Sequence, residues 1–150
     1  MSEATTIRRE LDRSGKIIYT NKGVSMLPLL REGRDAMIIE KPKGRLQKYD
    51  VPLYIRPDGA YVLHRILKVR EWDYVIAGDN CISREYGITD DDIIGVMTAI
   101  VRNGKTIKTD NFWYKLYYHV WCDFFPIRAF ILKVKFKLKN KFHRGDKNGK

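Results

Sequence analysis

Apolar and polar residues alternate in short runs along the first two thirds of the chain, and turn-forming residues separate the runs. This pattern is typical of short antiparallel strands that pack one face against a core. Asn103-Gly104, between two such runs, is the strongest hairpin signal in the sequence. We expect strands over residues 16–20, 36–40, 51–56, 61–69, 74–77, 93–102 and 106–108. The pattern therefore predicts a mostly β protein whose antiparallel sheet is coiled and partly barrel-like.

The hydrophobic period is helical at both ends of the chain. Near the start, Ile7 and Leu11 lie four residues apart in a predicted short helix over residues 3–13, and Gly15 is suited to end it.

In the C-terminal region, Asp110 or Asn111 can cap a helix, and Pro126 separates two helical segments. The apolar faces comprise Trp113, Leu116, Tyr117, Val120, Trp121 and Phe124 in the first segment, and Ile127, Phe130, Ile131, Val134 and Leu138 in the second. Residues 133–139 also alternate with period two, which leaves a strand as the alternative there. The longer run favours a helix.

Charge divides the chain at nearly the same place. Residues 1–101 carry 16 Lys/Arg and 15 Asp/Glu, whereas residues 102–150 carry 13 and 3, so the last third holds nearly all of the net charge of +11. We therefore expect a β domain over residues 1–108 and a basic, aromatic helical tail over residues 109–150. A neutral body with a basic tail indicates a tethering surface rather than a nucleic-acid-binding body.

Cysteine usage and hydropathy bear on the compartment. Cys81 and Cys122 are far apart and have no metal-binding spacing, so a reducing compartment is the simple interpretation. Residues 1–13 are polar and charged, and no segment has the apolar length of a membrane span. Export and a transmembrane anchor are both disfavoured, and we expect the protein to be cytoplasmic.

One serine stands out in the segment Gly23-Val24-Ser25-Met26-Leu27-Pro28, between a glycine and an apolar run that contains proline. A backbone with little freedom can hold the Ser25 hydroxyl at the edge of an apolar pocket. A serine hydroxyl is a poor nucleophile unless a base lies within hydrogen-bond reach.

His64 is the histidine best suited to be that base. His119 and His143 lie in the tail, whereas His64 lies in a predicted strand, on the same face as Val62 and Ile66. Taken alone, a satisfied core histidine is the commoner interpretation. The presence of the serine segment favours the interpretation of His64 as a general base. The ordinary pKa of histidine suits proton transfer near neutrality.

Five motifs follow one another along roughly residues 20–105: Gly23-Val24-Ser25-Met26-Leu27-Pro28, Gly33-Arg34-Asp35, His64-Arg65, Gly78-Asp79-Asn80 and Ile93-Ile94-Gly95-Val96. In this order they resemble the motifs of the signal peptidase I and SOS-repressor-like serine peptidases. The resemblance implies a coiled all-β fold, in agreement with the strands predicted above. The chain departs from the family in lacking a membrane anchor before the serine. Too few residues precede the serine for a DNA-binding unit, so we do not expect a self-cleaving repressor.

The resemblance implies peptide-bond hydrolysis with Ser25 as nucleophile. Most bacterial members have a lysine base where this chain has His64, so the chain is similar to the Ser/His subgroup of the endoplasmic-reticulum and archaeal type. Lys68, two alternation steps further along the strand, is an alternative base. In that subgroup an acidic residue just after the Gly-Asp-Asn motif completes the site, and Glu85 stands here in place of aspartate. Either Glu85 or Asp79 can hold the imidazole in the required tautomer, or Asp79 can tie down its own loop.

Two further expectations concern the substrate. The Ser25 backbone N–H is the expected oxyanion donor, whereas Gly23 cannot supply the hydroxyl that some members place two residues before the nucleophile. Substrates of the family carry small side chains beside the scissile bond. We expect a precursor or leader peptide with small residues near the cleavage site.

Each motif also has a non-catalytic interpretation. Ser25 can cap a short helix, and Asp79-Asn80 can be a simple β-turn. Cys81 has no second feature that supports a cysteine mechanism. The run Asp90-Asp91-Asp92 is more typical of a solvated turn than of a metal site, so we predict no metal and no cofactor. The alternative functions are a catalytically inactive peptide-binding or regulatory module of the same fold, and a basic membrane- or nucleic-acid-binding protein.

The tail has three interpretations. Residues 128–150 carry nine Lys/Arg and one acidic residue, together with Phe130, Phe136 and Phe142. Such a segment can lie on an anionic bilayer, which makes the protein peripheral on the inner face of the membrane. Alternatively, the helices pack on the β domain with their lysines in water. Binding of nucleic acid or an acidic partner is less favoured, because no nucleic-acid recognition motif is present.

Overall fold

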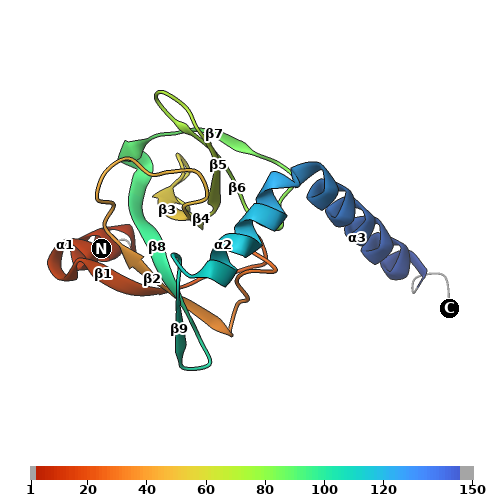
Figure 1. Cartoon of the computed structure of the whole chain (residues 1–150), viewed down its shortest axis with the longest axis horizontal. Helices are drawn as coiled ribbons and strands as arrows, with labels where there is room; N and C mark the ends of the chain where they lie inside the picture. The colour runs from red at the N-terminus through yellow and green to blue at the C-terminus, as the bar shows by residue number, and fades with distance from the viewer. Residues whose placement is uncertain (1–2, 146–150) are drawn as a thin grey trace.

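The computed structural model describes residues 3–145 and contains three α-helices and nine strands over that range (Figure 1). In chain order the elements are α1 (Glu3–Ser14), β1 (Lys16–Thr20), β2 (Asp35–Glu40), β3 (Pro52–Ile55), β4 (Tyr61–Leu63), β5 (Arg65–Val69), β6 (Tyr74–Ala77), β7 (Glu85–Ile88), the 3-10 turn η1 (Asp90–Asp92), β8 (Ile93–Arg102), β9 (Lys105–Lys108), α2 (Phe112–Tyr118), the π-helical turn η2 (His119–Asp123) and α3 (Phe125–Gly145).

Two antiparallel sheets form the body. The larger has the order β1-β2-β8-β3-β4, with β9 also paired to β8, and the smaller has the order β5-β6-β7. Strand β8 curls around the centre of the molecule (Figure 1), and the whole is a curled half-barrel. The predicted fold class is therefore confirmed: the protein is mostly β, with a short N-terminal helix and C-terminal helices.

Local signals placed several element ends correctly. Gly15 ends α1 with φ +73° and donates its N–H to the carbonyl of Leu11. Asn103 and Gly104 both have positive φ in the β8–β9 turn, as a type I′ hairpin requires.

The single strand predicted over residues 61–69 is wrong. His64 belongs to neither β4 nor β5, since β4 pairs with β3 in the larger sheet and β5 pairs with β6 in the smaller one. The chain therefore passes from one sheet to the other at His64. Strand β7 was not predicted either, because its short sequence, with Gly87 at φ +76°, carries little apolar alternation.

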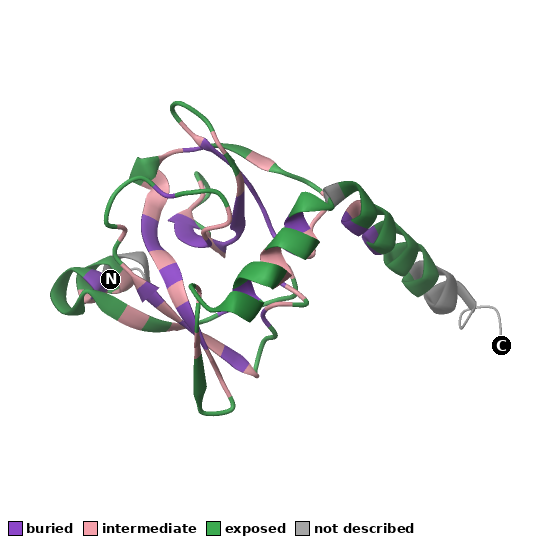
Figure 2. Ribbon diagram, viewed as in Figure 1, coloured by how far each residue is buried: buried purple, intermediate pink, exposed green. Residues whose placement is uncertain are grey.

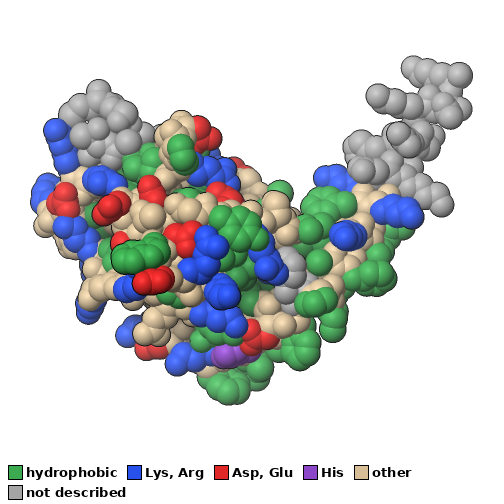
Figure 3. Space-filling model, turned by 90° about the horizontal axis from the view of Figure 1, so that it is seen from above, with side chains coloured by type: hydrophobic (Ala, Val, Ile, Leu, Met, Phe, Trp, Pro, Cys, Tyr) green, Lys and Arg blue, Asp and Glu red, His purple; other side chains and the backbone are tan. Residues whose placement is uncertain are grey.

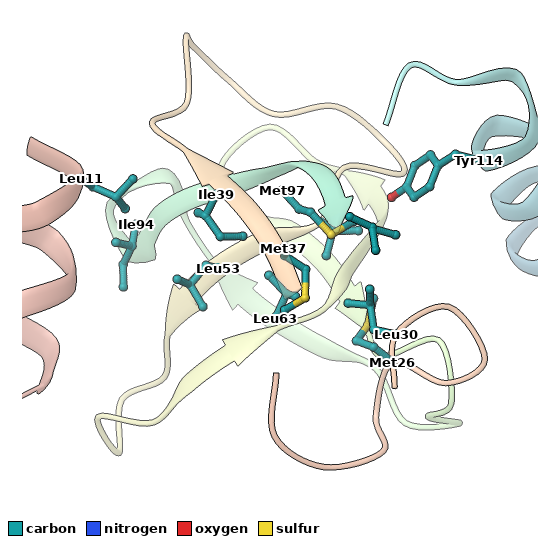
Figure 4. Close-up of a cluster of buried hydrophobic side chains, with 12 residues drawn as sticks. Leu11, Met26, Leu30, Met37, Ile39, Leu53, Leu63, Ile94, Met97 and Tyr114 are labelled. Carbon is teal, nitrogen blue, oxygen red and sulfur yellow. The ribbon is translucent and has the colours of Figure 1, made fainter. Parts of the chain in front are cut away.

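Two clusters of buried side chains fill the body. The larger lies against the larger sheet and includes Met26 and Leu30, which come from the segment that follows Ser25 (Figure 4). The smaller contains Tyr54 of the larger sheet together with Ile66 and Tyr74 of the smaller one, and lies between the two sheets. Buried residues follow the curl of the sheets (Figure 2). The serine segment is thus anchored in the main core.

The predicted C-terminal helices are present, and the strand alternative over residues 133–139 is not. The Asn111 side chain caps α2 by accepting from the N–H of Trp113 at 2.9 Å. The predicted apolar face of the first segment is only partly correct. Tyr114 and Cys122 are the buried residues there, whereas Trp113 is 71 % exposed. Tyr114 is part of the larger core cluster, and its hydroxyl accepts from Arg65 at 3.2 Å.

Helix α3 extends away from the body (Figure 1). Its described side chains end at Lys139, so Phe142 and His143 of the predicted tail, together with residues 146–150, lie outside the described part. In the part of the chain that the structure describes, no helix has the length and apolar character needed to span a membrane.

Candidate active site

Ser25 lies in a tight turn between β1 and β2. The turn is fixed on its far side by Met26 and Leu30, which are 0 % exposed, and the N–H of Leu30 donates to the carbonyl of Met26 at 2.9 Å. On its near side, Gly23 has φ +85°, which L side chains rarely adopt, and its N–H donates to the Glu32 carboxylate at 2.7 Å. The backbone around the serine is therefore held from both sides.

The Gly-Asp-Asn motif, residues 78–80, is hydrogen-bonded to this turn. The backbone N–H of Asn80 donates to the carbonyl of Ser25 at 2.7 Å, and the Asn80 side-chain amide donates to the carbonyl of Val24 at 3.0 Å. Two motifs more than fifty residues apart in the sequence thus meet through direct hydrogen bonds.

Gly78 is where the serine turn meets His64. A Cβ at this glycine would lie 2.6 Å from the carbonyl oxygen of Ser25, 2.8 Å from Sγ of Cys81 and 3.0 Å from Nε2 of His64. Real Cβ atoms do not approach other atoms so closely, so only glycine fits. The serine carbonyl and the imidazole therefore both border Gly78, which has no room for even a methyl group.

His64 is buried and held by a carboxylate. Its side chain sits at the crossing between β4 and β5, and Nδ1 lies 2.9 Å from Oε1 of Glu85, on β7. Because an ionised carboxylate only accepts hydrogen bonds, Nδ1 carries the proton and Nε2 is left as the basic nitrogen. This is the nitrogen that faces Gly78 and the serine turn. Burial lowers the pKa of His64, although the charge of Glu85 opposes the shift.

Glu85 is shared between His64 and a cation. Arg56, just after β3, donates to both Glu85 oxygens at 2.7 and 2.6 Å. Burial alone would raise the pKa of Glu85, but the hydrogen bonds from Arg56 and Tyr54 outweigh it and lower the pKa. The carboxylate therefore stays ionised. Arg56 offsets part of the negative charge that would stabilise an imidazolium, and its own charge lowers the pKa of His64.

Asp79 serves a different set of contacts. It is fully buried and accepts two hydrogen bonds from the guanidinium of Arg65, at 2.8 and 2.9 Å, and one from the hydroxyl of Tyr117 at 2.9 Å. Of the two acidic candidates, Glu85 contacts the imidazole, and Asp79 ties its loop to β5 and to helix α2.

The C-terminal region supports the same loop from outside. The indole N–H of Trp121 donates to the carbonyl of Asp79 at 2.8 Å. The guanidinium of Arg128, only 2 % exposed, donates to the carbonyls of Gly78 and Cys81 at 3.2 and 2.8 Å. The tail is therefore joined to the body as far as Arg128, although its composition changes at residue 109.

Lys68 does not share the position of His64. A bulge between Ile66 and Lys68 interrupts the strand alternation on which the alternative base depended. Lys68 is exposed and lines a surface pocket, of about 540 Å³, whose lining includes neither Ser25 nor His64.

The two cysteines and the acidic run at residues 90–92 show no sign of a catalytic or metal-binding role. Cys81 and Cys122 are free thiols, and burial raises the pKa of both. Asp90 forms an ion pair with Arg45, and the acidic run forms the turn η1. Among the described residues, no group of His, Cys, Asp and Glu side chains could hold a metal ion.

Two groups of Ser25 are available for a ligand. Within the described residues, neither its hydroxyl nor its backbone N–H makes a hydrogen bond, although its carbonyl accepts one from Asn80. No hydrogen bond joins this hydroxyl to His64, but the serine turn and the basic imidazole nitrogen border the same glycine, Gly78. A serine hydroxyl and N–H of this kind, with an imidazole base, are the groups that attack a carbonyl and stabilise the resulting oxyanion.

Sequence reasoning missed three supporting residues. Arg56 pairs with Glu85 from 29 positions away, and Trp121 and Arg128 reach the Gly78–Cys81 loop from the tail. The only local indication of these contacts was a hydrogen-bond donor within an otherwise aromatic or apolar segment. The donors are the indole N–H of Trp121 and the guanidinium of Arg128.

The two neighbours of His64 are expected to shift its titration in opposite directions. Replacing Glu85 with glutamine removes a charge that raises the pKa of His64, so that pKa falls. Replacing Arg56 with glutamine removes a charge that lowers it, so the pKa rises. The pH dependence of the His64 Cε1 proton resonance measures both.

Glu71→Gln is the matched control, since it removes the same charge from an exposed turn. It should leave the His64 titration unchanged. Shifts of Glu85→Gln and Arg56→Gln in the same direction, or none in either, would contradict this arrangement. A general base acts in its neutral form, so the acid limb of the pH–rate profile follows the pKa of His64. That limb should move to lower pH in Glu85→Gln and to higher pH in Arg56→Gln.

Comparisons with protein-family models, with curated proteins and with solved structures find no match to this chain.

Proposed function

We propose that this protein is a serine endopeptidase in which Ser25 is the nucleophile, His64 the general base and Glu85 the residue that orients His64. The observation that carries the proposal is the set of contacts around Gly78. There the serine turn and the Nε2 atom of a carboxylate-held imidazole lie on either side of a position that tolerates no side chain.

The chemistry follows the order of a serine acyl transfer. The Ser25 hydroxyl attacks the scissile carbonyl while Nε2 of His64 takes its proton, and the Ser25 N–H donates to the oxyanion. The tetrahedral intermediate collapses to an acyl-serine as His64 gives the proton to the leaving amine. Water, deprotonated by His64, then releases the acyl group and regenerates the serine.

An extended peptide has a place to bind beside the serine turn. Strand β1 is an edge strand that leads directly into this turn, and its Ile18 side chain is 73 % exposed. A groove of about 920 Å³ is lined by β1, by α1, by residues 59–61 and by Asn21 and Lys22, so that it ends short of Ser25 and its lining does not include His64. An edge strand can pair with an added peptide strand through main-chain hydrogen bonds. We therefore propose a peptide substrate, with the small residues near the cleavage site that the family resemblance implies.

Cleavage of a peptide library tests the proposal. Incubation with a mixture of random peptides, read out by mass spectrometry of new termini, should give products with small residues on the acyl side of the cleaved bond. Ser25→Ala should give none, and Ser83→Ala, the same change at an exposed serine, should match the wild type. Equal cleavage by the wild type and Ser25→Ala would end the proposal.

A second candidate is a peptide-binding module without catalysis. The two hydrogen bonds from Arg56 to Glu85 favour it, because they weaken the carboxylate's stabilisation of an imidazolium. Retention of library peptides by the wild type, without new termini, would support this candidate over the peptidase.

A further inference from the structure

Helix α3 leaves the body after about two turns. Arg128 and Leu132 are each 2 % exposed, and every described side chain from Lys133 to Lys139 is exposed. The helix nevertheless continues to Gly145. The side chains of residues 133–139 are thus turned to solvent, and packing against the body does not explain the apolar residues among them.

The free part carries an apolar stripe. Ile127, Phe130, Ile131, Val134 and Leu138 recur with helical spacing, and each is between 42 and 68 % exposed. Monomeric proteins rarely leave contiguous apolar surface of this kind in water. In the space-filling view, hydrophobic side chains follow the projecting helix beside basic ones (Figure 3).

Lysines border the stripe on both sides. At 3.6 residues per turn, Lys133 and Lys137 lie on one side of it, and Lys135 and Lys139 lie on the other. The described side chains of α3 include no acidic residue. Long lysine side chains beside an apolar stripe can reach outward to anionic headgroups while the stripe enters the acyl boundary.

The exposed apolar surface continues before α3. Trp113 and Phe112 of α2, together with Val120 and Phe124, are between 55 and 71 % exposed. Aromatic residues such as Trp113 favour the headgroup level of a bilayer.

We propose that the α2–α3 region is an interfacial anchor that binds the surface of an anionic lipid bilayer, with α3 lying in the plane of the interface. We infer a lipid surface as the binding partner rather than a groove on another protein. The apolar stripe is bordered by positive charge on both sides, and no acidic residue interrupts it between residues 127 and 139. The proposal does not depend on peptidase activity. Since Trp121 and Arg128 hold the loop that fastens the serine turn, an anchored tail also places the Ser25 site beside the membrane.

Vesicle co-sedimentation of the full chain tests this proposal. Vesicles of equal parts phosphatidylglycerol and phosphatidylcholine should bind the protein, with binding that weakens as salt is raised, and pure phosphatidylcholine should bind it far less. Lys133→Gln with Lys137→Gln should weaken binding about fivefold per lysine. Phe130→Ser with Val134→Ser should weaken it about tenfold or more, since both apolar side chains leave the bilayer.

Matched controls make the same changes elsewhere. Trp72→Ser alters the most exposed large apolar side chain of the body, and Lys43→Gln with Lys105→Gln removes two exposed lysines. Neither should weaken binding, and far-UV circular dichroism checks that each variant keeps its helices. Absence of binding to the anionic vesicles, or equal losses in tail and control variants, would overturn the proposal. So would a lipid-free dimer that Phe130→Ser with Val134→Ser dissociates, since a second copy would then cover the stripe.

Discussion

Replacing His64 with alanine is expected to lower the rate of peptide hydrolysis by about 10³-fold, within the range of general acid–base catalysis. The substitution removes the nitrogen that faces the serine turn and leaves Glu85 paired with Arg56, so no buried charge is left without a partner. The loss should therefore be catalytic rather than structural. The measurement is kcat/KM for the peptide that the library identifies as best cleaved.

His119→Ala is the matched control for that experiment. His119 is exposed, and its Nδ1 lies 2.9 Å from a carboxylate oxygen of Asp123 on the surface. Its removal should leave kcat/KM within about twofold, because surface pairs contribute little. An unchanged kcat/KM in His64→Ala would remove His64 from the mechanism.

Breaking the buried pair of Arg65 and Asp79 is expected to lower the free energy of unfolding by about 3–5 kcal/mol, the usual cost of leaving one partner of a buried ion pair alone. Both side chains are 0 % exposed, and Asp79 also accepts from Tyr117. Urea denaturation of Asp79→Ala, followed by far-UV circular dichroism, measures the loss. Since the Asp79 carboxylate also accepts from Tyr117 and the Asp79 carbonyl accepts from Trp121, the near-ultraviolet signal of the tail's aromatic residues should change as well.

Arg70→Ala removes the exposed partner of the surface ion pair between Arg70 and Asp73. It should cost at most about 1 kcal/mol. Tyr117→Phe, which removes a single hydrogen bond to Asp79, should cost about 1 kcal/mol and keeps the experiment informative where Asp79→Ala does not fold. Equal stabilities of Asp79→Ala and Arg70→Ala would contradict this role for the buried pair.

The strands that the sequence predicted well are those whose signals are local. Strand β8 was placed at its true ends, Ile93 and Arg102, because a long apolar run ends at an Asn-Gly turn. The division of residues 61–69 into β4 and β5 at His64 was not predicted. Apolar–polar alternation within a segment contains no information on the sheet in which each part of it pairs. Pairing partners are set by contacts between distant residues.

In the candidate site, too, the features set by local sequence were predicted and those set by contacts between distant residues were not. Ser25 and His64 were selected by the types of their neighbours and by the order of the motifs. The different partners of Glu85 and Asp79 could not be separated in advance, because they depend on Arg56 and Arg65, whose side-chain directions follow from the packing of two sheets. In α2, the helical period was correct, but Tyr114 is buried rather than Trp113, because Tyr114 packs in the larger core cluster and accepts from Arg65 of the distant strand β5.

The most direct test of the catalytic assignment is the position of a covalent label. The full chain is incubated with a fluorophosphonate at neutral pH, and the adduct is located by peptide mapping. The account predicts a single adduct on Ser25, slowed strongly in His64→Ala and missing in Ser25→Ala. Labelling spread over other serines, or an unlabelled Ser25 in the folded protein, would contradict it.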